Sequence, residues 1–455
     1  MTHDDYNKKI LNIKDNNIHF YENSLKIIKI NGTDVKAFYA YLTYTPDHCS
    51  VCGCINNGSK DIIKWNYKRK CKIKMPRICN YKTILFLDKQ RFYCKNCKHT
   101  FIATTDVVDF HKQTSNDTIL SIKLGLMKKE SEKNISYNND VSINTTNRIL
   151  DSIADDKLTR FHSRLPSSFG IDEFNATKDT DGKMAFIIVN HYNNNIFDIL
   201  NGRKDKTIET YFKRYPKFER NKVKFITMDL YKPYYILMHK LFKNAILIPD
   251  RFHIVIQFRN ALDKTRISLC KKSNKDYRKL KKYWKLILKN EDELDDKKKR
   301  YSPCFRKEVT EQYIVSYLVN SNDTLKATYN YYQGLLKSLN NRDKDKFINI
   351  IHNLNPNVSE YAKKCNKTLL DMEKYIVNAF DYDLSNGAVE GTNNIIKQVK
   401  HNACGYKLFK HLRARILLIK GVYKILEEKR ELIFSPLWMF FIIEFGIHQH
   451  YLFKW

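Results

Sequence analysis

Three acidic residues stand where the chain leaves predicted elements of secondary structure. Asp172, in the run "FGIDEF", is expected at the end of the first strand, and Asp229 ends "VKFITMD". Glu390 follows a helix start marked by Ser385, Asn386 and Gly387. Carboxylates at the ends of neighbouring strands, with one more on a facing helix, could converge on a single edge of a sheet. Oxygen ligands of this kind suit Mg²⁺ or Mn²⁺, and two such ions activate an attacking oxygen and stabilise a leaving oxygen in phosphodiester chemistry.

Two further residues could share this edge. Asp250 ends another strand-like run, "AILIPD", and is an alternative second metal ligand to Asp229. His253 follows one helical turn later, as a partner near the metal or the DNA, or as a structural histidine bonded to backbone. The order of the strands favours Asp229 as the ligand.

The residues after Glu390 form a polar helical face. Amides and cations at i+3, i+4, i+7 and i+11 lie on the side of Glu390 and could hold a phosphate and a flanking base. The alternative is a solvated polar face. The residues concerned are Asn393, Asn394, Lys397 and His401, with Lys400 beside them. Further along the chain, Arg413 and Arg415 are expected to be ordinary phosphate contacts or surface residues.

The elements around these residues predict a mixed α/β sheet. Strand-like runs at 169–174, 184–190 and 196–201 are joined by short turns, and they are followed by a helix, a strand at 223–229, a second helix and a strand at 245–250. Between about residues 254 and 382 the strand signals stop, and apolar residues recur at helical spacing. A last long helix should begin near Ser385 and break around Gly405.

Seven of the eleven cysteines lie between Cys49 and Cys97. "CSVC" and "CKNC" are two CxxC pairs, and four thiolates from two such pairs can bind one structural Zn²⁺. Cys49, Cys52, Cys94 and Cys97 are therefore the predicted zinc ligands, although Cys54, Cys71 and Cys79 leave room for exchanged ligands. The alternative is a set of buried cysteines without metal.

Residues 117–153 could form a helix-turn-helix. Ser142 is a plausible N-cap, with Ile143, Thr146, Ile149 and Leu150 facing inward. Short amphipathic helix pairs without DNA-binding function show the same pattern. The residues expected to face a major groove are Asn144, Thr145, Asn147 and Arg148.

The composition favours a nucleic-acid partner. The chain has 455 residues and a formal net charge of +32, a charge that a polyanion would neutralise. An AT-rich coding sequence drifting toward lysine is the other explanation. The polar start and clustered cysteines indicate a cytoplasmic protein, associated with the bacterial nucleoid when on DNA. The apolar stretch from Leu437 to Ile447 is too short to cross a membrane.

Several of these motifs together resemble a known family. "GIDEF", "TMDLYKPYY", "AILIPDRFHIV" and "SNGAVEGTNNIIKQVKHNACGYKLFKHLRARI" are similar, in this order, to DDE transposases of the ISL3 insertion-sequence family. The resemblance implies an RNase H-like core of the retroviral-integrase superfamily, a zinc-binding segment and a helix-turn-helix. By similarity, Asp172, Asp229 and Glu390 are the catalytic, metal-binding triad.

The expected fold is thus mixed α/β: an RNase H-like catalytic core with an all-helical insertion, preceded by a zinc ribbon and a helix-turn-helix. The expected function is binding of terminal inverted repeats in double-stranded DNA, with metal-dependent strand cleavage and strand transfer by a homo-oligomer. A DNA-binding regulator with an inactive core, or a nuclease without strand transfer, are the alternatives. The expected segments are a lead (1–45), the zinc ribbon (46–105), the helix-turn-helix (106–163), the core (164–257), the insertion (258–383), the C-terminal core helix (384–430) and an apolar tail (431–455).

Overall fold

The computed structural model describes residues 3–57, 60–157, 162–271 and 274–421. The chain divides into two compact units, one of Met1–Arg160 with Ile396–Trp455 and one of Phe161–Ile395. The expected tail of residues 431–455, and the end of the 384–430 segment, lie outside the described residues.

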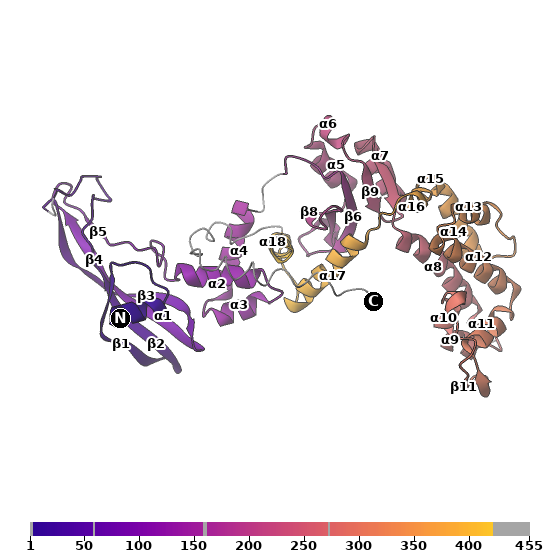
Figure 1. Cartoon of the computed structure of the whole chain (residues 1–455), viewed down its shortest axis with the longest axis horizontal. Coiled ribbons are helices and arrows are strands. Elements are labelled where there is room, and N and C mark those ends of the chain that lie inside the picture. The colour runs from indigo at the N-terminus through magenta and orange to yellow at the C-terminus, as the bar shows by residue number, and fades with distance from the viewer. Residues whose placement is uncertain (1–2, 58–59, 158–161, 272–273, 422–455) are drawn as a thin grey trace, which may run out of the picture. The chain divides into compact units, whose positions relative to one another are not determined.

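A five-stranded sheet dominates the start of the first unit (Figure 1). Its main path has the order β1-β2-β4-β3, with β2 parallel to β4 and β5 paired to β4. Strands from the predicted lead therefore share one sheet with strands between the two cysteine pairs. The elements are α1 (His3–Ile10), β1 (Ile18–Ile30), β2 (Thr33–Leu42), β3 (Ile62–Ile78), β4 (Tyr81–Cys94) and β5 (Thr100–Ile102).

Helices α2 (Asn116–Leu126), α3 (Glu132–Asn138) and α4 (Ile143–Lys157) follow in the same unit. Serine side chains cap all three, since Ser115, Ser131 and Ser142 each accept a hydrogen bond from a backbone N–H of the first turn. Helix α18 (Phe409–Ile419) packs against α4 and α2. The part of the chain expected to end the catalytic core thus joins the N-terminal helices.

The second unit contains the predicted mixed sheet, with strand order β10-β9-β6-β7-β8. Strands β6, β7 and β8 are antiparallel neighbours, whereas β9 and β10 run parallel to β6. The elements are β6 (Ser168–Asn175), a 3₁₀ turn (Asp181–Lys183), β7 (Met184–Asn190), β8 (Ile196–Leu200), α5 (Asp205–Lys213), α6 (Lys217–Arg220), β9 (Phe225–Met228), α7 (Lys232–Leu241) and β10 (Ile246–Pro249).

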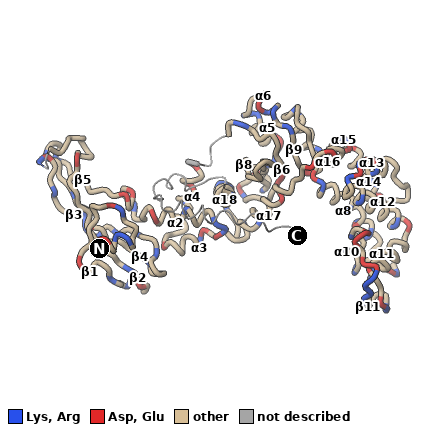
Figure 2. The backbone as a smooth tube through the Cα atoms, in the orientation of Figure 1, with Lys and Arg blue, Asp and Glu red and all other residues tan. Residues whose placement is uncertain are grey.

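The insertion after β10 is helical except for one hairpin, so the expectation of an all-helical insertion is wrong. Strands β11 (Arg300–Ser302) and β12 (Lys307–Val309) pair antiparallel. Pro303 cannot continue a helix, Arg306 adopts a positive φ of 54°, and both favour a turn. Several basic residues lie in the segment that leads into this hairpin (Figure 2).

The helices of this region are α8 (Arg251–Leu269), α9 (Tyr277–Lys282), α10 (Trp284–Ile287), a 3₁₀ turn (Glu291–Glu293), α11 (Glu311–Val319), α12 (Asp323–Asn340), α13 (Lys344–His352), α14 (Glu360–Asp371), α15 (Glu373–Ile376) and α16 (Asn378–Asp381). They share one hydrophobic core with the sheet of the second unit. Helix α17 (Gly387–Asn402) follows. A turn at Gly405, whose φ is 94°, separates it from α18, as the sequence predicted. Within the described ranges, no helix is both long and apolar enough to cross a membrane.

Candidate functional site

Three aspartates follow one another across the parallel strands of the second unit. Gly170 lies opposite Thr227 in the pairing of β6 with β9, and Met228 lies opposite Pro249 in the pairing of β9 with β10. Continuing this register places Asp172 beside Asp229, and Asp229 beside Asp250. The predicted side chains therefore gather at one edge of the sheet because equal offsets on parallel strands end at the same level.

Burial and mutual repulsion disfavour the ionised forms of the first two acids. Burial is the main cause that raises the pKa of Asp172. Burial, followed by the charge of Asp172, raises the pKa of Asp229 to about 7. A divalent cation between the two carboxylates would offset both effects, so this donor set fits a hard metal ion.

Asp250 and His253 complete this cluster. The ring Nδ1 of His253 lies 3.2 Å from Asp250 Oδ2 and 3.0 Å from Asp229 Oδ1. The bond to Asp250, and the charges of the surrounding aspartates, raise the pKa of His253. Asp229, Asp250 and His253 offer ligand atoms that all lie within 4.8 Å of one another, which makes them a second possible metal-binding set.

Helix α17 begins directly against this edge of the sheet. Asn386 accepts a hydrogen bond from Thr227 Oγ1 at 2.9 Å and donates one to the carbonyl of Ile171 at 3.2 Å. The backbone N–H of Glu390 donates to the carbonyl of Asn386, so Glu390 lies in the first turn. Sequence reasoning used Asn386 only as a helix-start signal and missed its role as the anchor of the helix.

Asn393 brings this helix to the first aspartate. Its Nδ2 donates to Asp172 Oδ2 at 2.6 Å, while its Oδ1 is buried without a hydrogen-bond partner among the described residues. Glu390 is exposed and stands one helical turn before Asn393 on the same face. The unpartnered amide oxygen beside Asp172 is an acceptor that could bind a cation or accept a hydrogen bond from the cation's bound water.

The rest of the predicted helical face is more open. Asn394, Lys397 and His401 are exposed, whereas Lys400 is half-buried and burial lowers its pKa. Exposed amides and cations are available to a ligand. The structure brings only Asn393 of this face into contact with the aspartates within the described residues.

Glu173, the acid next to Asp172, has a different environment. It accepts hydrogen bonds from Arg203 and from the hydroxyl of Tyr234. These two partners neutralise and orient the carboxylate. Glu173 therefore supports the sheet edge, whereas Asp172 is free to face the cluster.

The first unit holds a second candidate metal site. The sulfur atoms of Cys49, Cys52, Cys94 and Cys97 lie within 4.8 Å of one another. Two Sγ–Sγ distances, Cys49 to Cys97 and Cys52 to Cys94, are 3.8 Å. A tetrahedron with Zn–S bonds of about 2.3 Å has edges of about 3.8 Å, so the four thiols fit a zinc ion. Cys54 Sγ lies 3.3 Å from Cys94 Sγ and is a fifth thiol at this site.

The helices after the sheet include the residues predicted to read DNA. On α4, Asn144 and Arg148 are exposed, whereas Thr145 and Asn147 are half-buried. The expectation that Ile143 faces inward is wrong, because 45% of its surface is exposed. It is the first helical residue, so it precedes the turn at which α4 meets its neighbours.

Arg415 corrects another expectation, that it is a phosphate contact or a surface residue. It is completely buried, and its guanidinium lies 3.0 Å from a carboxylate oxygen of Glu132. It also donates to the carbonyls of Leu126, Lys128 and Glu130, at the end of α2 and in the loop after it. Sequence periodicity could not reveal this, because the partners lie more than 280 residues away.

The chain was compared with known protein families, and the match covers most of the second unit. Residues 169–416 match a family described as "Transposase", of the ISL3 type with a DDE motif. This match covers more than half of the chain and includes every aspartate of the sheet edge and helix α17.

A shorter similarity exists to a protein named "ATP-dependent protease" from Lactococcus lactis subsp. lactis. The two are 32% identical over 113 residues, which is 25% of this chain and 36% of that protein. The chain thus spans about a third of the length of this curated relative. So partial an overlap carries no function over to the chain.

Proposed function

This chain belongs to the ISL3 family of transposases. We propose that it binds the terminal inverted repeats of an insertion sequence and catalyses DNA strand cleavage and strand transfer. A transposase acts on DNA, as the net charge of +32 suggests. One observation carries the proposal: Asp172 and Asp229 follow at the same offset on adjacent parallel strands, and Asn393 of the Glu390 helix bonds to Asp172.

The topology of the second unit supports an RNase H-like core. Three antiparallel strands are followed by two strands parallel to the first, in the order β10-β9-β6-β7-β8. An acid on β6, a second directly after β9 and a third on a later helix are the arrangement that the family resemblance implies. The helical insertion separates β10 from α17 in the chain without adding a strand to this sheet.

Asp172, Asp229 and Glu390 would hold the divalent cations, Mg²⁺ or Mn²⁺. Two such ions would supply an activated attacking oxygen and a stabilised leaving oxygen. Asn393 orients the carboxylate of Asp172, and His253 holds Asp250 and Asp229 at a fixed separation.

The first unit would recognise the DNA ends. Four thiols spaced for a tetrahedral zinc ion stabilise one end of its sheet, and α3 and α4 are two short helices joined by a four-residue turn, as in a helix-turn-helix. Asn144, Thr145, Asn147 and Arg148 of α4 would face the major groove. Both ends of an element must be held together, so we propose a homo-oligomer on DNA.

The test is metal-dependent cleavage of a duplex that carries the element's terminal sequence. Asp172→Asn and Glu390→Gln should each lower the cleavage rate at least a hundredfold in Mg²⁺. Glu360→Gln is the matched control, because Glu360 is an exposed insertion acid paired only with Lys363 in the described part of the chain. Full activity of either triad variant defeats the assignment.

Following the donor ends into a target plasmid separates the remaining alternatives. Cleavage without joining indicates a nuclease, whereas end binding that is indifferent to metal and to the triad variants indicates a regulator with an inactive core. Cysteine substitution distinguishes Asp229 from Asp250, since a thiolate ligand favours softer Mn²⁺ over Mg²⁺. Rescue by Mn²⁺ should occur for Asp229→Cys and not for Asp250→Cys.

A further inference from the structure

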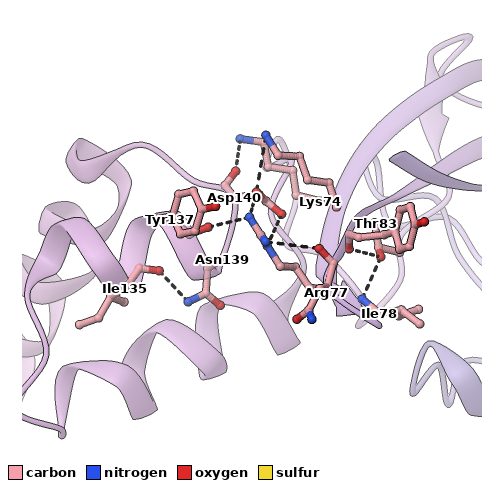
Figure 3. Close-up of polar contacts among 11 residues, drawn as sticks. Lys74, Arg77, Ile78, Thr83, Ile135, Tyr137, Asn139 and Asp140 are labelled. Carbon is pink, nitrogen blue, oxygen red and sulfur yellow. Dashed lines mark hydrogen bonds and ion pairs between the residues drawn. The ribbon is translucent and has the colours of Figure 1, made fainter. Parts of the chain in front are cut away.

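A charged contact joins the sheet that carries the four-cysteine cluster to the turn between α3 and α4 (Figure 3). Arg77, near the end of β3, donates from Nε to Asp140 Oδ2 at 2.9 Å and from Nη2 to Asp140 Oδ1 at 2.7 Å. The same Nη2 donates to the carbonyl of Tyr137 at 3.0 Å, and the guanidinium lies 5.1 Å from the centre of the Tyr137 ring. We name the contact between Arg77 and Asp140 the clamp.

The clamp is partly shielded from water. The side chains of Arg77 and Asp140 are 22% and 15% exposed, respectively. Two parallel hydrogen bonds from a planar guanidinium fix orientation as well as distance. Lys74 adds a hydrogen bond to the Asp140 carbonyl at 3.2 Å, and Lys82 Nζ lies 3.7 Å from its carboxylate. Three cations of the sheet therefore converge on one residue of the helical segment.

Asp140 occupies a position that controls α4. Its φ is 52°, the left-handed region, and the N-cap Ser142 follows two residues later. The turn that Arg77 holds is thus the turn that directs the predicted recognition helix.

Among the described residues, further hydrogen bonds join the sheet to α2 and the loop before it at Lys74. The Lys74 backbone N–H donates to the Gln113 carbonyl, and the Lys74 carbonyl accepts from the backbone N–H of Ser115 and from the hydroxyl of Thr118. These bonds all meet β3 at one position, and the clamp adds a second point of attachment three residues further along the same strand.

We propose that Arg77 and Asp140 are positioning residues that fix the distance and angle between the sheet of the four-cysteine cluster and helix α4, so that the first unit binds the element end as one composite site of fixed spacing. The inference rests on the proposed function, in which both parts contact the DNA end. Each inserted base pair rotates one half of such a site by about 34° and moves it by about 3.4 Å. A rigid DNA-binding unit cannot adjust to that change, whereas two loosely joined DNA-binding parts can.

The experiment measures equilibrium binding of the full-length protein to duplex DNA taken from the sequence that flanks its own gene. Footprinting first locates the protected stretches, and one or two base pairs are then inserted between them. Wild type should lose about tenfold or more in affinity for each spacing variant. Arg77→Met and Asp140→Asn should bind the native spacing less tightly, but their loss on insertion should fall below about threefold.

The variants are chosen to keep the fold. Asparagine tolerates the left-handed conformation of Asp140, so Asp140→Asn removes the charge without backbone strain. Arg77→Lys keeps the charge but not the fork, and it should give an intermediate spacing penalty. Arg69→Met is the matched control: Arg69 also lies on β3, its side chain is 73% exposed, and its loss removes the same charge. It should retain the full penalty.

The outcomes are distinguishable. Wild type that tolerates insertions, or clamp variants that keep the full penalty with normal zinc content, overturns the clamp inference and leaves the proposed function standing. A relaxed penalty in Arg69→Met overturns it as well, because charge alone would then explain the effect. Absence of binding to any flanking duplex refutes end recognition itself, and the clamp inference with it.

Discussion

Replacing Gly170 by alanine would perturb the contact between the sheet edge and helix α17. Gly170 lies on β6, two residues before Asp172. A β-carbon at this position would lie 2.5 Å from Asn386 Oδ1, 2.7 Å from Val389 Cγ2 and 2.9 Å from Thr227 Oγ1. All three side chains are buried, and ordinary carbon contacts are about 3.5–4.0 Å. The helix start must therefore retreat from β6 by about 1 Å.

Two effects of this displacement can be measured. Overpacking a closed core costs about 1–3 kcal/mol of unfolding free energy. For a unit of the size of Phe161–Ile395, that corresponds to a fall in Tm of about 2–12 °C. Val389 immediately precedes Glu390, and Asn386 lies one helical turn before it, so the carboxylate moves with the helix. A misplacement of about 1 Å can lower the rate about a hundredfold.

The assay combines thermal unfolding with single-turnover end cleavage at saturating DNA, at a temperature where the variant is fully folded. Gly391→Ala is the control, because a β-carbon there meets nothing within 4 Å. It lies inside α17, where alanine should stabilise the protein by about 0.5–1 kcal/mol. If Gly170→Ala unfolds and cleaves like wild type, the packing of α17 on β6 is refuted.

Three other predictions concern separate parts of the chain. Cys94→Ser should lower the zinc content below half and weaken end binding at least tenfold, whereas Cys71→Ser, which alters a cysteine outside the four-thiol cluster, should change neither when metal is assayed by mass spectrometry. Arg415→Met should destabilise the first unit by about 3–5 kcal/mol, because a half of a buried ion pair is lost; a fall of less than 1 kcal/mol in chemical denaturation would contradict the burial of its charge. Asn393→Ala should slow cleavage about tenfold or more without loss of DNA affinity, whereas Asn394→Ala should not alter the rate at saturating DNA; equal rates in both variants would remove Asn393 from the site.

Local patterns predicted the sheet of the second unit well. Its five strands coincide with apolar runs bounded by turns, and the parallel pairing of β6 with β9 then follows from the intervening helices. The gathering of Asp229 and Asp250 was predictable for the same reason, since each directly follows a strand. Asp172 was expected at a strand end but lies within β6, at the level where β9 ends, because β6 continues to Asn175 in its pairing with β7. The metals and the catalytic roles stay predictions.

Long-range packing was beyond the sequence. Arg415 was predicted to be an exposed or phosphate-binding cation, because the sequence of its own helix does not indicate that carbonyl groups at the end of α2 accept its hydrogen bonds. The hairpin of β11 and β12 was missed because strands of three residues are too short to show an alternating pattern. Likewise, the clamp between Arg77 and Asp140 joins residues 63 positions apart, which no periodicity connects.

The choice between Asp229 and Asp250 follows from the order of the strands. Neighbouring strands lie about 4.8 Å apart, so at equal register Asp229 is one strand from Asp172 and Asp250 is two. Two cations about 3.5–4 Å apart can be shared by ligands on adjacent strands, but not easily by ligands about twice as far apart. The anchor of α17 points the same way, since Asn386 bonds to Thr227 on β9 and to Ile171 on β6 rather than to β10. We therefore expect Asp250 to act through His253, which fixes the position of Asp229. Loss of Asp250 should lower the cleavage rate less than loss of Asp229.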